Sequence, residues 1–480
     1  MECIRFHNAR FFLNSCGGHL DSLHANETII AIATPAGHGA VGMVRISGPS
    51  TLDVLKRFTR LPDQSHGPAF TKEPRRLYYC QLVTIENQIL DDVLAVYYAG
   101  PRSYTGEDQA EIFLHGNPLL LRRFVNTVLD AFGDANVRPA GPGEFTRRAY
   151  LNGRMDLTQA EAVHQIITAR SELELEAGRK NIGGEISRLV SMFRSAMIHL
   201  KAETEAEIDF ADEDLTFEQL PERRRRVEDL LRRIQALLER AHETERLRSG
   251  VQIALVGIPN AGKSSLLNYI LGWDRALVSS TAGTTRDYLS EEIQLGGVPV
   301  RLVDTAGLRE TEDEIEKQGV LRSRRAIEES EIILHIVDSG AEPYTFPDFP
   351  EQCQVIHVFN KCDIRDGSAL YRDRSPDTIA LNISCVTGEG IDYLRDVITE
   401  QVLGSENTPD PILLEDRQRY HFHQIRNALE KLLELWSTNA PAEICALELD
   451  RAIEHTGMIS GRIDNEEILG RIFSVFCIGK

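Results

Sequence analysis

A glycine-rich loop between a predicted strand and a predicted helix constrains this chain most. In residues 251–271, VQIALVGIPNAGKSSLLNYIL, a GxxxxGKS loop occupies Gly257–Ser264. Backbone N–H groups of such a loop bind phosphates, while Lys263 reaches the outer phosphates and the Ser264 hydroxyl binds Mg²⁺. Apolar strands alternate with helical segments over residues 251–403, which predicts a doubly wound, mostly parallel sheet around this loop.

Three further motifs follow in the order expected of a GTP site. VRLVDTAGL places Asp304 where it can hold Mg²⁺ through water, and leaves the Gly307 N–H to sense a γ-phosphate. In VIHVFNKCD, Asp363 can accept the two donors that guanine has and adenine lacks, while Asn360 contacts the opposite edge of the base. The NISC loop, Ser384–Cys385, can supply a backbone donor to the guanine oxygen.

The polar segment VSSTAGTTRDYLS is typical of a switch that orders around a γ-phosphate. Thr285 or Thr284 is the natural second hydroxyl ligand of Mg²⁺. Leu308 follows DTAG where Ras-type enzymes carry a water-orienting Gln, and no arginine finger is obvious in the sequence. The residues predicted to contact GTP are Asn260, Ala261, Gly262, Lys263, Ser264, Ser265, Ser279, Ser280, Thr281, Ala282, Gly283, Thr284, Thr285, Asp304, Thr305, Ala306, Gly307, Asn360, Lys361, Asp363, Ser384, Cys385 and Val386.

Composition limits the remaining possibilities. A chain of 480 residues has room for two to four domains, and it contains no apolar run long enough to cross a membrane. Its eight cysteines form no CxxC pair, which indicates reduced thiols in a cytosol-like compartment. The net charge of −20 opposes sequence-independent binding to nucleic acid. The densest basic run, Arg223–Arg226, is predicted to be a solvated helix face whose replacement changes stability little.

The sequence predicts a multidomain fold in which an α/β domain is inserted into a helical one. Short β-like runs predict a small α+β domain over residues 27–142. Ala, Leu, Glu and Arg recur at helical spacing over residues 143–249 and 404–480, which predicts helices there. These two helical parts flank the α/β residues 250–403. Residues 1–26 are expected to be a disordered extension, with an upstream start codon or a transit peptide as alternatives. GHGAVG, Gly37–Gly42, fits a dinucleotide motif, but the β-rich sequence after it predicts a tight turn.

These motifs, together with VRISGP, SYTGEDQAEIFLHGN, PGEFTRRAYLNG and the terminal GRIFSVFCIGK, resemble the bacterial tRNA uridine-5-carboxymethylaminomethyl(34) modification GTPases, the TrmE/MnmE family. The resemblance covers residues 28–480. It implies an N-terminal domain that binds a tetrahydrofolate one-carbon donor and forms a homodimer, a helical domain, and an inserted G domain. It also implies a K⁺ ion in place of an arginine finger, with Asn260, Ser279, Thr281 and Thr284 as ligands, and Glu316 as the carboxylate that orients the water.

The resemblance further implies that Arg45, Glu111, Arg154 and Lys480 bind the folate, whose anionic tail suits arginines. It places Cys477, in the C-terminal tail, near the one-carbon chemistry. From the residues themselves, Cys477 could equally be a small packed hydrophobe, and a prenylation site is disfavoured by Gly479 and Lys480. The family commonly has Pro-Gly-Arg-Gly at residues 36–39, where this chain has His38 in place of the arginine.

The function implied is GTP-dependent addition of a carboxymethylaminomethyl group to C5 of the wobble uridine of certain tRNAs. The implied cofactors are Mg²⁺, K⁺ and 5,10-methylenetetrahydrofolate, with the 5-formyl form as an analogue. The implied partner is a FAD-dependent protein of the glucose-inhibited-division type, bound in a cytoplasmic heterotetramer. Two rivals remain: a switch GTPase of the ribosome-assembly kind, and a folate-dependent transferase in which the G domain is regulatory.

Overall fold

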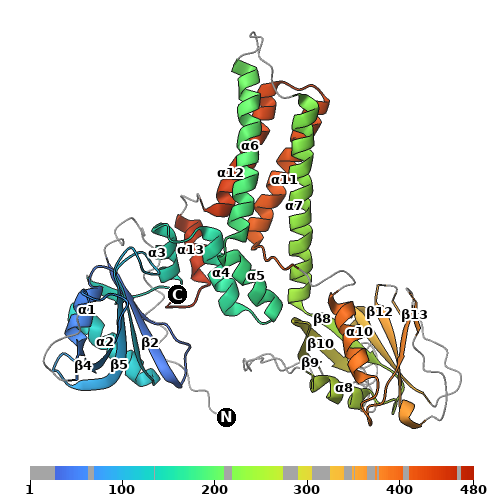
Figure 1. Cartoon of the computed structure of the whole chain (residues 1–480), viewed down its shortest axis with the longest axis horizontal. Helices are drawn as coiled ribbons and strands as arrows, with labels where there is room; N and C mark the ends of the chain where they lie inside the picture. Colours follow the sequence, from blue (N-terminus) through green and yellow to red (C-terminus); the bar gives the residue numbers. More distant parts are fainter. Residues whose placement is uncertain are drawn as a thin grey trace, which may run out of the picture. The chain divides into compact units, whose positions relative to one another are not determined.

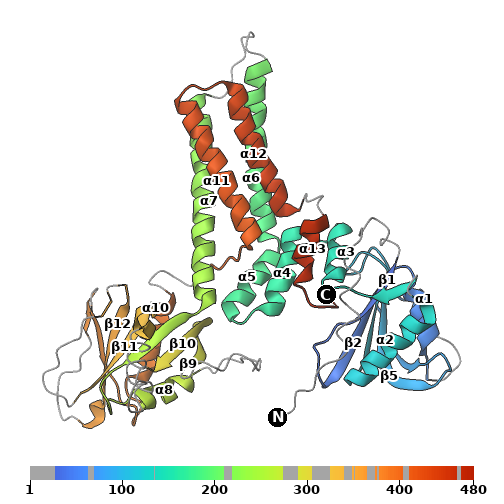
Figure 2. The same cartoon turned by 180° about the vertical axis from the view of Figure 1, so that it is seen from behind.

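Figures 1 and 2 show the computed structural model of the chain from two sides. It describes residues 27–62, 70–133, 136–209, 219–273, 290–304, 325–339, 349–350, 352–364, 373–375, 378–403, 410–461 and 466–479. The predicted extension, residues 1–26, therefore lies outside the described part. The chain divides into two compact units, one formed by residues 1–160 with 461–480 and the other by residues 161–460.

The first unit is built on a seven-stranded sheet in the order β3-β4-β5-β6-β2-β1-β7. Its paired strands are antiparallel except β1 and β7, which run parallel. Its elements are β1 (Thr28–Ile32), β2 (Gly39–Ser47), α1 (Thr51–Phe58), β3 (Thr59–Arg60), β4 (Leu77–Val83), β5 (Ile89–Tyr98), β6 (Gln109–Gly116), α2 (Pro118–Phe132), β7 (Val137–Pro139), α3 (Glu144–Leu151) and α13 (Glu466–Ser474).

Alternation along the strands separates a packed face of this sheet from a polar one. Ile46 on β2 and Ile112 on β6 point to the face that α1 and α2 cover, where they share a core with Phe124 of α2. Successive side chains of a strand point to opposite faces, so Arg45 and Glu111 lie on the other face. The two residues are paired in register across β2 and β6.

The glycine-rich segment Gly37–Gly42 adopts no helix. Gly37 has a φ of 126°, a conformation that favours glycine, and β2 begins two residues later at Gly39. A dinucleotide site of the GxGxxG type needs a helix N-terminus at this point. The segment is therefore no dinucleotide site, but the predicted tight turn is confined to Gly37, because Gly39 and Gly42 belong to β2.

In the second unit, four long helices form a bundle. Helix α12 lies along α6 and α11 lies along α7, as Figures 1 and 2 both show. Phe193 of α6 and Phe422 of α11 meet edge to face in the core, with ring centroids 6.4 Å apart. The helices of this part are α5 (Glu172–Ile182), α6 (Glu185–Asp209), α7 (Leu220–Ser249), α11 (Asp416–Ser437) and α12 (Ala442–Ser460), while α4 (Leu157–Thr168) spans the two units.

Between α7 and α11 the chain forms a second seven-stranded sheet, ordered β13-β14-β12-β11-β8-β10-β9. Its central strands β14, β12, β11, β8 and β10 are parallel, and β9 and β13 add antiparallel edges. The elements are β8 (Val251–Val256), α8 (Lys263–Leu271), β9 (Ser290–Leu295), β10 (Val298–Asp304), β11 (Ile332–Asp338), β12 (Gln354–Asn360), a 3₁₀ turn (Cys362–Ile364), β13 (Asp373–Ser375), β14 (Thr378–Asn382) and α10 (Ile391–Leu403).

A buried polar junction ties α4 to the start of α11. Arg417 donates from Nε and Nη2 to the two carboxylate oxygens of Glu161, at 3.1 and 2.9 Å, and Gln418 donates to Oε2 of the same carboxylate. Close by, Gln165 donates to Glu415, the N-cap residue of α11. The junction therefore joins chain segments that stand on either side of the α/β residues in the sequence.

The predicted fold class is confirmed: an α+β domain, an all-α part and an α/β P-loop domain with a mostly parallel sheet occur in one chain. The predicted domain boundaries stay predictions. Among the helices that the structure describes, none combines the length and the apolar character needed to cross a membrane.

The basic run on α7 differs from its prediction as a solvated face. Arg223 is 6% exposed and makes a two-pronged ion pair with Glu207 of α6. Arg226 also reaches across to α6, where it contacts Glu203 at 3.1 Å. Arg224 and Arg225 are the exposed members of the run. The structure therefore contradicts the prediction at Arg223, which joins two helices.

We expect Arg223→Ala to lower the free energy of unfolding by about 1–3 kcal/mol, because it leaves the half-buried Glu207 carboxylate without its partner. Arg224→Ala is the matched control, since its pair with Glu228 is exposed and such pairs contribute roughly 0–1 kcal/mol. Urea unfolding of the full chain, followed by far-UV circular dichroism, measures both. Equal stability of the two variants would contradict this account of Arg223.

Candidate functional site

The P-loop is pressed tightly against the end of β12. Lys263 is 5% exposed, and its ammonium group donates to the carbonyls of Gly257 and Ile258, both at 2.8 Å. Gly262 has a φ of 99°, and a Cβ there would collide with the side-chain amide of Asn360. The loop is thus curled around its own lysine with no room for a larger residue at Gly262, as close backbone approach to phosphates requires.

Asn360 links the P-loop to the loop after β14. Its buried side chain donates from Nδ2 to the carbonyl of Ala261 at 3.0 Å and accepts at Oδ1 from the N–H of Cys385 at 3.3 Å. Asp363 lies exposed in the 3₁₀ turn that follows. Burial, followed by the charge of Asp363, raises the pKa of the Cys385 thiol.

The loop after β14 is held by its own hydrogen bonds. Ser384 is fully buried, and its hydroxyl accepts from the N–H groups of Val386 and Thr387 at 3.2 and 3.1 Å. The N–H of Cys385 is bound by Asn360. These N–H groups already have acceptors within the protein. For the loop to donate to the guanine oxygen as predicted, that oxygen must compete with the side-chain oxygens of Ser384 and Asn360.

The remaining nucleotide-site predictions divide according to what the structure describes. Ser264 and Ser265 are exposed in the first turn of α8, Asn260 is exposed with a φ of 65°, and Asp304 is buried at the end of β10. Lys361 bonds Asp338 at the end of β11, at 2.7 Å. The predicted residues that lie outside the described part are Ser279, Ser280, Thr281, Ala282, Gly283, Thr284, Thr285, Thr305, Ala306, Gly307 and Glu316.

A second polar cluster surrounds Arg45 on the open face of the first unit's sheet. Its Nε and Nη2 both contact Oε1 of Glu111, at 3.0 and 2.9 Å. The guanidinium carbon lies 5.6 Å from the ring centre of Tyr104 and 5.7 Å from that of Phe145. Two residues predicted to bind folate are thus in contact, and two aromatic rings hold the arginine in place.

The C-terminal tail docks on the same cluster. Arg45 Nη1 donates to the carbonyl of Gly479 at 3.0 Å, and Ile478 pairs with Pro142 as an isolated β-bridge. The carbonyl of Cys477 accepts from the N–H of Gly143 at 3.4 Å, while its side chain is exposed. The tail thus reaches the residues predicted to bind folate. Lys480 lies outside the described residues.

Arg154 does not join Arg45 directly. It follows α3, and its Nε donates to the carbonyl of Ser103 at 3.1 Å. Ser103 precedes Tyr104, whose ring lies over Arg45. The two predicted folate arginines are therefore connected through one loop. His38 is exposed immediately before β2.

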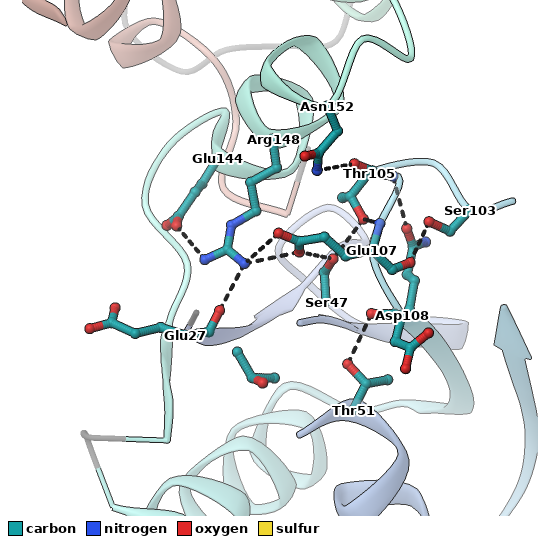
Figure 3. Close-up of polar contacts among 12 residues, drawn as sticks. Glu27, Ser47, Thr51, Ser103, Thr105, Glu107, Asp108, Glu144, Arg148 and Asn152 are labelled. Atoms are coloured by element: carbon teal, nitrogen blue, oxygen red, sulfur yellow. Dashed lines mark hydrogen bonds and ion pairs between the residues drawn. The ribbon is translucent and has the colours of Figure 1, made fainter. Parts of the chain in front are cut away.

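Figure 3 shows the polar network that fastens this loop, residues 103–108, to α3 and to the end of β2. Arg148 of α3 donates to both oxygens of Glu107, at 3.3 and 3.0 Å, and Ser47 Oγ donates to Glu107 Oε2 at 2.8 Å. Asn152 donates to the carbonyl of Thr105 at 2.7 Å (Figure 3). The loop is therefore held by two elements, α3 and β2.

The network also holds a strongly acidic carboxyl. Burial opposes ionisation of Glu144, but hydrogen bonds from Arg138 and from the N–H of Gly141, with the charge of Arg148, outweigh it and lower the pKa to about 2. Both carboxylate oxygens are used, since Arg138 donates to Oε1 at 2.7 Å and to Oε2 at 2.8 Å. Glu144 is therefore ionised at neutral pH as part of a closed ion-pair cluster.

Sequence reasoning missed Tyr104, Phe145, Arg148 and Glu107. Their motifs, SYTGED and PGEFTRRAYLNG, supported the resemblance, but nothing local in them shows that they meet. Asp338, which binds the lysine of NKCD, was also missed. Its position at the end of a predicted strand is a signal that could have identified it.

A mostly parallel sheet that carries the P-loop, Asp304 and the NKCD motif at its strand ends defines a GTP-binding protein of the P-loop class. Family models extend this result over nearly the whole chain. A model described as MnmE helical domain matches residues 157–477, and one described as GTP-binding protein TrmE N-terminus matches residues 28–154. The chain belongs to the MnmE family, also called TrmE.

Individual relatives match over their full length. The tRNA modification GTPase MnmE of Leptospira interrogans is 45% identical, covering 95% of this chain and 100% of that protein. The proteins of the same name from Leptospira biflexa and Aquifex aeolicus are 41% and 38% identical, with the same coverage. Among solved structures, the G domain of the T. maritima FeoB iron transporter is 24% identical over 32% of this chain and 98% of that chain, with a TM-score of 0.23.

We expect Glu144→Gln to destabilise the first unit at neutral pH and progressively less in acid. The folded-state pKa of about 2 lies below the ordinary 4.5, so the stabilisation is present above pH 4.5 and is lost as the pH falls toward 2. Its size at neutral pH is roughly 3 kcal/mol. Calorimetric scans of wild type and variant from pH 7 to acid should show a gap in Tm that narrows, with Asp130→Asn on the exposed side of α2 as the control. A gap independent of pH would contradict the assignment.

Proposed function

We propose that this chain is a GTP-hydrolysing tRNA modification enzyme. With a FAD-dependent partner, it adds a carboxymethylaminomethyl group to C5 of the wobble uridine of certain tRNAs. The observation that carries this proposal is full-length identity of up to 45% to proteins named tRNA modification GTPase MnmE. The P-loop site and the Arg45 cluster support it, because a simple switch GTPase has no use for the second cluster.

In the proposed reaction Lys263 neutralises the outer phosphates of GTP, and Asp363 selects guanine over adenine. The chain's hydroxyl and amide oxygens fit hard cations. The Ser264 hydroxyl, exposed at the start of α8, would hold Mg²⁺ with Thr285, and the exposed Asn260 side chain would hold K⁺ with Ser279, Thr281 and Thr284. When bound, the two cations stabilise the charge that develops on the transferred phosphoryl group. Glu316 is proposed to orient the attacking water.

The Arg45 cluster is proposed to bind a tetrahydrofolate one-carbon donor. A guanidinium has five N–H donors, and the described residues Glu111 and Gly479 engage three of those on Arg45. The remaining donors suit the carboxylates or amide-like edges of a folate. Arg154 and Lys480 complete the proposed contacts, and Cys477 is proposed to act near the one-carbon unit.

A row of apolar residues beside this cluster supports a homodimer. Tyr79, Leu94, Phe113 and Met43 are paired in register across β4, β5, β6 and β2, on the face that α1 and α2 leave uncovered. Tyr79 is 55% exposed and Leu94 is 39% exposed. Contiguous exposed apolar surface is typical of an interaction site, and we propose a second copy of the chain as its occupant. Association with the FAD-dependent partner, binding of tRNA and a cytoplasmic location complete the proposal.

We expect Leu94→Glu to convert the dimer to a monomer, because it places a charge in the centre of the proposed interface. Light scattering coupled to gel filtration measures the mass. Glu400→Gln, on α10 of the α/β domain, serves as a charge-changing control that should leave the dimer intact. A variant that remains dimeric would remove this row from the interface.

The experiment that tests the function is a mass-spectrometric census of modified uridines in tRNA from cells that lack this protein. We expect wild type to restore carboxymethylaminomethyluridine, and Cys477→Ser with a normal GTPase rate to fail. Restoration by Cys477→Ser would mean that the exposed thiol takes no part in the chemistry. Restoration by Asp363→Asn without GTP turnover would favour the folate-dependent transferase, and no restoration by wild type beside an active partner would favour the switch GTPase.

A further inference from the structure

The loop that carries Tyr104 lies between the two arginines for which folate contacts are proposed. The ring of Tyr104 faces the guanidinium of Arg45, and the residue before it accepts a hydrogen bond from Arg154. Both neighbours of Tyr104 in the chain, Ser103 and Thr105, are buried. The position of the ring is therefore set by the loop's attachment to the fold.

That attachment comes from α3 and β2, as Figure 3 shows. The Arg148–Glu107 ion pair and the bond from Asn152 to Thr105 fix the loop to α3, and a hydroxyl contact of 2.7 Å between Thr105 and Ser47 fixes it to β2. Gly106 has a φ of 82°, and a Cβ there would lie 2.9 Å from the Asn152 side chain. A tight glycine turn thus brings the loop against α3.

The tyrosine hydroxyl adds a further constraint. It shares a hydrogen bond of 2.9 Å with the hydroxyl of Thr146 on α3. A second ring beside Arg45 belongs to Phe145, the residue next to Thr146, which is fully buried. Rotation of the guanidinium is therefore limited by rings from two elements, while Glu111 fixes its in-plane orientation.

We infer that Tyr104 is a positioning residue of the one-carbon-donor site, whose ring holds Arg45 in the orientation that binds the anionic or amide-like groups of a tetrahydrofolate. The inference rests on the proposed function, and it assigns the role to the aromatic ring rather than to the hydroxyl. Pre-ordering Arg45 reduces the conformational entropy that the side chain loses when a ligand binds.

The test is titration calorimetry of the full chain with 5-formyltetrahydrofolate. We expect Tyr104→Leu to raise the Kd about tenfold, and Tyr104→Phe, which keeps the ring, to stay within about threefold of wild type. Tyr420→Leu, at an exposed tyrosine of α11, is the matched control. Binding of a fluorescent GTP analogue should be unchanged in all three variants. If Tyr104→Leu only misfolded, fewer binding sites per chain would be measured at an unchanged Kd. That result would count against a positioning role.

A double-mutant cycle with Arg45→Lys separates positioning from direct contact. If Tyr104 acts through Arg45, the loss in Tyr104→Leu should largely disappear in the Arg45→Lys background, because neighbouring residues that act together are not additive. Additive losses would overturn the inference, as would wild-type affinity of Tyr104→Leu. Those outcomes leave the folate proposal standing, whereas a wild-type chain that binds no 5-formyltetrahydrofolate would overturn both.

Discussion

The buried contact between Glu161 and Arg417 is the interaction on which the second unit's architecture depends. Isolated buried charges are costly, so a carboxylate at this position is tolerated because Arg417 and Gln418 satisfy it. Any shift of α11 along its axis would break these bonds. The pair therefore sets where α11 begins, and with it the register of α11 against α7 and of α12 against α6. Burial raises the pKa of Glu161, and the charge and hydrogen bonds of Arg417 oppose that shift.

Both candidate sites use the same device to shape a loop. At the nucleotide site the side-chain amide of Asn360 spans the P-loop and the loop after β14, and at the Arg45 cluster the amide of Asn152 holds the loop of Tyr104. In each case a glycine with positive φ, Gly262 or Gly106, lies against that asparagine. Loops fastened in this way to helices and strands present backbone and side chains with little conformational freedom, which suits the binding of anionic ligands.

The sequence predicts the α/β fold and the P-loop well, because strand, loop and helix are contiguous and each motif has a local physical meaning. The β-rich sequence after Gly37–Gly42 predicted a strand for the same reason, and β2 occupies Gly39–Ser47. Arg223 was not, because a basic helix turn looks the same in sequence whether it faces water or Glu207 on the preceding helix. The contact between Arg45 and Gly479 joins residues 434 positions apart, and no local pattern encodes it. The resemblance named Arg45 and Glu111, whereas the rings that hold Arg45 emerged from the structure.

The separation of the bundle's two halves has a consequence for synthesis. Helices α6 and α7 precede the α/β residues, and their partners α11 and α12 follow. At a translation rate of about 5–20 residues per second, the roughly 170 residues between α7 and α11 take on the order of ten to thirty seconds to emerge. During that time the apolar faces of α6 and α7 lack their native partners α11 and α12. The α/β domain can therefore fold before the bundle does. The tail that bonds Arg45 follows both halves of the bundle and the α/β domain in the sequence, so the cluster around that arginine is completed only after those parts have been made.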